Sequence, residues 1–188
     1  MTEIRLIQAF PQELFDDVIL VAQYLENQKI KLHDNTQCEV IIHQALIKIP
    51  ARIYINAVQS VEFQNFPLIQ RQILWCLFTR HHDGFVRQKA LEKLLQQNLE
   101  YFMTPFIFQL LGEYVAEILK IIEPHLNENN QNKWSDFILE NCQYFQTTQS
   151  RIVSYWNEYY RSSYPDFKNY IGHQILTKLK KYEESCFK

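Results

Sequence analysis

Apolar residues recur every three or four positions along most of this chain. That spacing places them on one face of an α-helix, whereas a half-buried strand needs alternation at every second position. Sustained alternation followed by a hairpin turn is absent, so the pattern predicts an all-α fold of about eight helices. The predicted helices cover residues 11–25, 36–50, 53–63, 67–79, 84–95, 104–123, 132–145, 148–161 and 165–184.

Local signals place several of these helix starts. Pro11 and Pro165 suit the first turn of a helix, and Thr36 and Glu39 have the spacing of a capping box. The isoleucine-rich residues 53–63 would also fit a strand, but the neighbouring sequence offers no partner strand. We therefore predict a helix there as well.

The polar turn and helix at residues 80–95 form the most informative segment. Asp83 stands where its side chain can cap the helix that follows. Helical spacing divides the helix into a face predicted to be buried and an opposite polar face. The first contains Phe85, Val86, Ala90, Leu91, Leu94 and Leu95, and the second contains Arg87, Gln88, Lys89, Glu92, Lys93 and Gln96.

The pattern Asp83-x-x-Val86-Arg87-x-x-Ala90-x-x-x-Leu94 resembles the turn and second helix of a HEAT repeat, and the resemblance covers residues 69–95. The family implies a HEAT-like stack of antiparallel helical hairpins. It also implies that the aspartate caps a helix and that the arginine bonds toward an adjoining repeat. Because the Val-Arg signature occurs only once, an irregular α-helical bundle is the alternative architecture.

Composition supports one domain over residues 1–188. The 188 residues are 47% hydrophobic, which suffices for a sizeable core, and only three are glycine. No Gly/Ser-rich or Pro-rich stretch marks a linker. The sequence therefore predicts one cooperative unit.

Charge and cysteine content narrow the environment and the partners. The net charge of −2 comes from interspersed acids and bases, so nucleic acid is an unfavoured partner. No apolar run approaches the ~20 residues that span a membrane, and the first residues lack the features of a secretory signal. The four cysteines form no CxxC pair. We expect a cytoplasmic protein without a membrane segment; the oligomeric state is not predicted.

The turn also offers possible metal ligands. His81, His82 and Asp83 carry imidazole and carboxylate groups, which bind metal ions well. Adjacent residues rarely direct three side chains at one centre, however, and no HExxH pattern lies nearby. A polar turn with a capping aspartate is the favoured interpretation.

Two carboxylates could serve as an acid and a base. Glu113 and Glu117 fall one turn apart on the predicted helix 104–123. A solvent-exposed edge of that helix explains the pair more simply. An intermediate possibility is a structural polar clamp between helices, formed by Arg80, Asp83, Arg87, Glu113 and Glu117. We assign no catalytic, cofactor-binding or metal residue and expect no cofactor.

Aromatic residues are dense in the last third of the chain. Tyrosine and tryptophan combine a large contact area with a polar tip, which suits a binding surface. Core packing is the alternative explanation, and Tyr160 and Tyr164 are the members expected to point outward. The candidate interaction surface consists of Trp156, Tyr159, Tyr160, Arg161 and Tyr164.

The favoured function is that of a non-catalytic protein–protein interaction module, an adaptor or inhibitor whose partner is another protein. The first alternative is a small enzyme with acid/base or metal chemistry around Glu113, Glu117 and residues 81–83. The second is a helical repeat protein that binds nucleic acid, which would need a basic stripe. Gly112 and Gly172, both inside predicted helices, indicate close helix crossings, with a notch for a ligand or partner side chain as the alternative.

Overall fold

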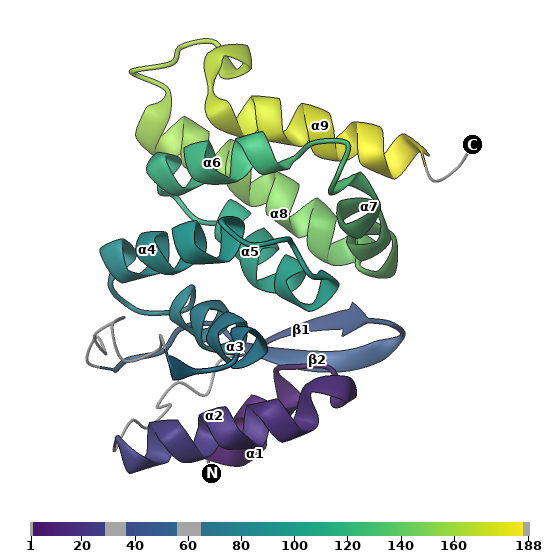
Figure 1. The fold of residues 1–188 in the computed structure, drawn as a ribbon. Coiled ribbons are helices and arrows are strands. Elements are labelled where there is room, and N and C mark those ends of the chain that lie inside the picture. Colours follow the sequence, from purple (N-terminus) through teal and green to yellow (C-terminus); the bar gives the residue numbers. More distant parts are fainter. Residues whose placement is uncertain (1, 29–36, 56–64, 186–188) are drawn as a thin grey trace. The chain divides into compact units, whose positions relative to one another are not determined.

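The structure is a computed structural model that describes residues 2–28, 37–55 and 65–185 (Figure 1). The chain forms two compact units, Met1–Gln97 and Asn98–Lys188. Both units are mainly helical, and the described residues contain nine α-helices. This confirms the predicted fold class. Among the helices that the structure describes, none is both long and apolar enough to cross a membrane.

The first unit contains four helices and a β-hairpin in its described part. Helix α1 packs on α2, α2 on α3, and α3 on α4, while β2 contacts α1. The elements are α1 (Thr2–Gln8), a 3-10 turn (Gln12–Leu14), α2 (Phe15–Asn27), β1 (Gln37–Ile42), β2 (Ala45–Pro50), α3 (Leu68–Phe78) and α4 (Gly84–Leu95).

The predicted helix over residues 36–50 is wrong, because this segment is the antiparallel hairpin β1–β2. His43 and Gln44 form its two-residue turn, and both have positive φ, as a type I′ turn requires. Val40, Ile42, Ile47 and Ile49 are buried, while Glu39 and Lys48 form an ion pair of 3.0 Å on the opposite face. The β-branched residues thus alternate at period two, which the capping-box match obscured.

The predicted helix over residues 53–63 is wrong where it begins. Ile53 is extended and forms a parallel bridge with His81. Residues 56–64 lie outside the described residues.

Helices α3 and α4 pack on each other, but the buried face of α4 is rotated from the predicted one. Phe85 is 78% exposed, whereas Arg87 is buried together with Ala90, Leu91 and Leu94. Phe85 precedes Arg87 by two residues, or about 200° around the helix, so the two cannot share a face. The arginine lies inside because its guanidinium binds backbone carbonyls of the preceding turn.

The second unit contains five α-helices in its described part. The elements are a 3-10 turn (Tyr101–Met103), α5 (Thr104–Leu111), α6 (Ala116–Ile122), a 3-10 turn (Glu123–His125), α7 (Gln131–Glu140), α8 (Cys142–Tyr155), a π-helical turn (Trp156–Tyr160), a 3-10 turn (Phe167–Asn169) and α9 (Ile171–Ser185). Buried aromatic rings of α7 and α8 pack around Phe108 of α5 in the core of this unit.

The predicted long helix over residues 104–123 is divided into α5 and α6. Gly112 is the C-cap of α5, and Val115 is extended. Glu113 therefore lies in the break and is buried, whereas Glu117 is exposed in the first turn of α6. The two carboxylates are not one turn apart on a shared helix, contrary to the prediction.

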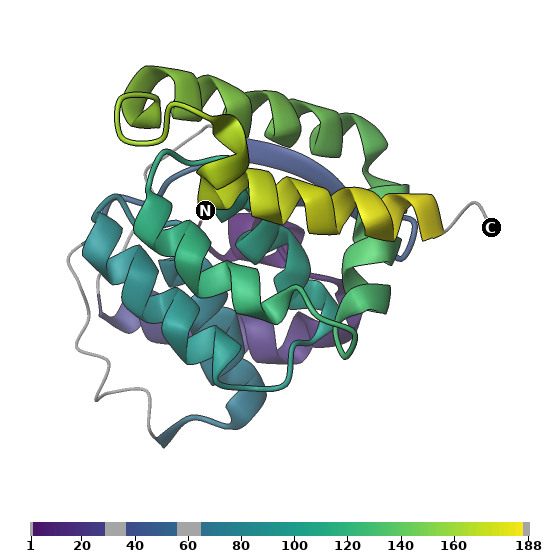
Figure 2. The same ribbon diagram turned by 90° about the horizontal axis from the view of Figure 1, so that it is seen from above.

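Helices α8 and α9 lie next to each other (Figure 2). Their close approach is at Gly172, so the expected close crossing is confirmed at this glycine. A Cβ atom here would lie 2.6 Å from Ile152 Cγ2 and 2.5 Å from the Tyr170 ring. Gly112, by contrast, lies at a helix end, where Arg151 covers it. At Gly172, therefore, only a hydrogen atom fits between the α9 backbone and the side chains of Ile152 and Tyr170.

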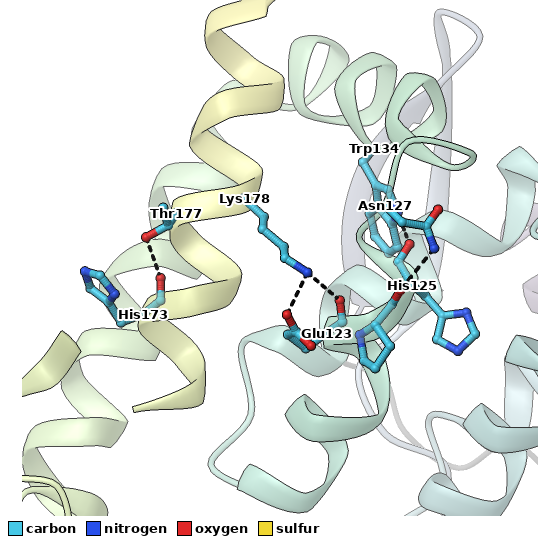
Figure 3. A network of polar contacts seen from close by, with 8 residues as sticks. Glu123, His125, Asn127, Trp134, His173, Thr177 and Lys178 are labelled. Carbon is cyan, nitrogen blue, oxygen red and sulfur yellow. Dashed lines mark hydrogen bonds and ion pairs between the residues drawn. The ribbon is translucent and has the colours of Figure 1, made fainter. Parts of the chain in front are cut away.

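A polar network joins the end of α6 to α9 (Figure 3). Lys178 Nζ lies 2.6 Å from Glu123 Oε1 and donates to the Glu123 carbonyl at 3.3 Å. On the other side of this turn, Trp134 Nε1 donates to the His125 carbonyl at 3.4 Å. A cation at the C-terminal end of a helix offsets the partial negative charge of the last carbonyls. The network therefore fixes how α9 packs within the second unit.

Candidate functional site

The turn after α3 is tied to the segment that follows β2. The Ile53 N–H donates to the Arg80 carbonyl at 2.7 Å, and the His82 N–H donates to the Ile53 carbonyl at 2.9 Å. Arg80 Nη2 donates to the Ala51 carbonyl at 3.0 Å. Two chain segments about thirty residues apart are thereby held together mostly through backbone atoms.

His81 lies at the centre of this turn and uses both ring nitrogens. Nε2 lies 2.8 Å from the Ile55 carbonyl, and Nδ1 accepts from the Asp83 N–H at 3.0 Å. This pairing requires the neutral tautomer with its proton on Nε2. Burial lowers the pKa of His81, which favours the same neutral state.

The same contacts decide what the turn can do chemically. A metal ligand needs a free nitrogen lone pair, and the only lone pair of neutral His81 faces the Asp83 N–H. Asp83 accepts from the Phe85 N–H at 2.8 Å, the helix cap that the sequence predicts. In the part of the chain that the structure describes, no group of three His, Cys, Asp or Glu side chains is arranged for a metal ion.

The five residues of the predicted polar clamp fall in both units. In the first unit, Arg87 Nη1 donates to the carbonyls of His81 and His82, each at 2.9 Å. Arg87 thus fastens the turn to its own helix. Glu113 and Glu117 belong to the second unit, and their pairing with Arg80 or Arg87 stays a prediction.

A cluster of three tyrosine rings contains the most exposed aromatic side chains that the structure describes in the second unit. Tyr114 comes from the break between α5 and α6, while Tyr155 and Tyr159 come from the end of α8 and its π-helical turn. Ring centroids lie 5.6 Å apart for Tyr114 and Tyr159, and 6.1 Å apart for each of the other two pairs. Tyr114 is 53% exposed, Tyr159 is 56% exposed, and Tyr155 is half-buried. We call these three residues the tyrosine surface.

Tyr160 holds this surface in place from beneath. Its hydroxyl donates to the Tyr114 carbonyl at 2.6 Å and accepts from the Ala116 N–H at 3.1 Å. The ring stacks on buried Tyr170, with centroids 5.1 Å apart. Burial raises the pKa of Tyr170, with further contributions from Tyr160 and Glu117. One phenol therefore bridges the two ends of the break between α5 and α6.

The role of the predicted interaction surface stays a prediction, and the exposure of its members differs from the expected one. Tyr159 is exposed, whereas Tyr160 and Tyr164 are only partly exposed. Trp156 Nε1 donates to the Tyr164 carbonyl at 2.9 Å, and Arg161 lies over the Trp156 ring at 5.9 Å. The Trp156 indole N–H and the Arg161 guanidinium thus both have partners within the chain.

Tyr114 and Tyr155 are members that the sequence did not single out. In an uninterrupted helix over residues 104–123, Tyr114 would lie among apolar residues, so its exposure depends on the break that follows Gly112. Tyr155 shares a helical face with core residues and lies one turn before Tyr159. Two features of the sequence could have indicated this surface. Tyr155 and Tyr159 are four residues apart on one helical face, and Gly112 can end a helix just before Tyr114.

Two acidic side chains accompany the tyrosine surface. Glu158 precedes Tyr159 in the π-helical turn, and Glu117 follows Ala116 at the start of α6. Both are exposed, and neither makes a hydrogen bond or ion pair with another described residue. Arg151, one turn before Tyr155, is exposed and lies against Gly112. The arrangement offers contact area and charge rather than an assembled proton-transfer site.

Comparison of the chain with protein-family models, with curated proteins and with solved structures found no match.

Proposed function

We propose that this chain is a non-catalytic protein-binding module, a HEAT-like cytoplasmic scaffold whose partner contacts the tyrosine surface. The observation that carries the proposal is the exposed contact among Tyr114, Tyr155 and Tyr159. Tyrosine gives a large contact area for few rotatable bonds, and it is enriched at the centres of protein interfaces.

Support from beneath makes this surface suited to binding. Tyr160 bridges the backbone on both sides of the break that carries Tyr114, and it stacks on a buried ring. A surface that is already ordered loses less conformational entropy when a partner binds. The π-helical turn at Trp156–Tyr160 also supports a binding role, because such turns occur frequently at functional sites.

The local geometry gives less support to the enzyme alternative. Glu113 is buried in the break and Glu117 is exposed on α6, so they are not the paired carboxylates of one helix face. The lone pair of His81 Nδ1 already accepts a backbone N–H. No described residue of the tyrosine surface has a base positioned to activate it.

Site-specific photo-crosslinking tests the proposal directly. Tyr159 is replaced by p-benzoylphenylalanine in the full chain, and the protein is irradiated in its native cells. We expect one dominant protein adduct, and unlabelled wild-type protein should reduce its formation by competing for the partner. A Tyr114→Ala/Tyr155→Ala competitor should be about 30-fold weaker, which corresponds to the ~2 kcal/mol of an interface hot spot.

The matched control places the same crosslinker at Gln146. This residue is exposed on α8, but it lies nine positions before Tyr155 and so on the opposite side of the helix. An adduct formed equally from positions 146 and 159, or none from position 159, would contradict the proposal.

A further inference from the structure

The geometry of the tyrosine surface limits what a partner can place on it. Centroid separations of 5.6 to 6.1 Å bring the three rings into contact with each other. A partner group must therefore lie on top of the rings, which favours a flat group.

The ring faces and the neighbouring charges favour a cation. The face of an aromatic ring carries negative potential, and cations bind within about 6 Å of its centroid. Glu117 and Glu158, the two acids beside the surface, are exposed and make no ion pair with another described residue. Lys120, one turn after Glu117 on α6, does not pair with it either. The two carboxylates are thus available to a cation from outside the chain.

Two arginines of the chain lie at this end of the unit and make contacts of their own. Arg161 stacks over Trp156 at 5.9 Å and donates to Asn157 Oδ1 at 3.0 Å. The side chain of Arg151 lies across Gly112, with its Cδ atom 3.3 Å from the position of an added Cβ. Arg161 also illustrates how a guanidinium seats on an aromatic ring at this end of the unit. Guanidinium is planar and less strongly hydrated than ammonium, so it stacks more readily.

We propose that the tyrosine surface binds an arginine side chain of the partner protein. The guanidinium stacks on the exposed faces of Tyr114 and Tyr159 and pairs with the carboxylate of Glu158 or Glu117. This inference rests on the proposed function, because it names the partner group that the binding module recognises.

The test titrates the full chain, carrying ¹³C-labelled tyrosine rings, with N-acetyl-arginine amide in the millimolar range. N-acetyl-citrulline amide, which has a similar shape but no charge, is the matched probe. We expect saturable shifts of the Tyr114 and Tyr159 ring signals with the arginine probe, and shifts several-fold smaller with the citrulline probe. Equal responses to the two probes, or no response to either, would overturn the inference.

Substitutions assign the two parts of the contact. Tyr159→Leu keeps the apolar volume and removes the ring face, and we expect about twofold to fivefold weaker arginine binding. Glu117→Gln and Glu158→Gln together should weaken it by a similar factor, and ~0.5 M salt should have the same effect. The control is Glu184→Gln in the last turn of α9, about 18 Å along that helix from Gly172. Equal loss in the control and in the Glu117/Glu158 variant would also contradict the inference.

The two proposals fail in different ways. If the crosslinked adduct at position 159 persists while the arginine probe gives no response, only the arginine inference is wrong. If both the adduct and the response are absent, the proposed function is wrong as well.

Discussion

At the scale of single residues, two polar side chains set the local architecture by binding backbone atoms. Tyr160 closes the break between α5 and α6, and His81 joins the turn after α3 to the segment at Ile55. In the sequence, Tyr160 is a candidate interaction residue and His81 a possible metal ligand. In the structure, the polar atoms of both side chains make hydrogen bonds to the backbone. Such satisfied polar groups contribute to stability.

The Tyr160 hydroxyl should account for a measurable part of the stability. We expect Tyr160→Phe to lower the free energy of unfolding by about 1–3 kcal/mol, because the Tyr114 carbonyl and the Ala116 N–H both lose a partner. Urea denaturation measures the change. Tyr159→Phe is the control, since its hydroxyl is at the exposed surface, and it should change stability by less than about 0.5 kcal/mol. Equal effects of the two substitutions would refute the bridging role.

His81 should make stability depend on pH. Its pKa is lowered by burial, so the unfolded chain takes up its proton first, near the ordinary histidine pKa of about 6.5. The stability due to neutral His81 is complete above that pH, falls as the pH drops toward the folded-state pKa, and is constant below it. Urea midpoints between about pH 7 and pH 5 measure this slope.

The variant His81→Gln should flatten that slope, whereas His82→Gln should preserve most of it, because burial is the largest cause of the lowered pKa of His81 and the charge of His82 is a smaller one. The opposite ranking would contradict the assignment. His125, whose pKa burial also lowers, contributes the slope that remains in His81→Gln.

At the scale of elements, the glycines show how differently the same residue can act. Gly172→Ala should destabilise the protein by about 1–3 kcal/mol, because the new methyl group would overlap Ile152 and the Tyr170 ring. Gly84→Ala, in the first turn of α4, meets nothing closer than Arg87 Nη2 at 3.5 Å and should stabilise by about 0.5 kcal/mol. Thermal unfolding of the two variants checks the signs. Two shifts of the same sign would show that the crossing at Gly172 is not tight.

The sequence predicted the helices well where one apolar face was clear. The starts of α3 and α4 and the Asp83 cap follow from local spacing and capping chemistry. The hairpin was missed because Thr36 and Glu39 imitate a capping box, and because its turn residues, His43 and Gln44, lack the usual Asn-Gly signature.

The break after Gly112 was missed for a different reason. Nearly every residue around it is apolar, so helical periodicity could not reveal an interruption. The candidate surface was predicted from its aromatic composition, which is local information. Its exposed members could not be predicted, because the exposure of Tyr114 depends on a hydrogen bond to a tyrosine 46 residues away.

At the scale of the whole molecule, the chain should unfold in one transition. The segment where the two units join, around Gln97 and Asn98, contains no glycine, proline or serine. In a Trp75→Phe variant, tryptophan fluorescence reports only the second unit, through Trp134 and Trp156, while circular dichroism reports all helices. We expect the two urea curves to coincide. Separate midpoints would show that the units are independent domains.

The bridge made by Tyr160 has a consequence for reagents directed at the tyrosine surface. Tyr114 and Tyr159 lie 45 residues apart in the sequence, and the hydroxyl of Tyr160 helps to hold the Tyr114 backbone where the two rings meet. The surface is therefore a discontinuous epitope. A synthetic peptide spanning residues 150–164 would lack Tyr114 and should not compete with the folded chain, and antibodies raised against denatured protein should leave the surface open.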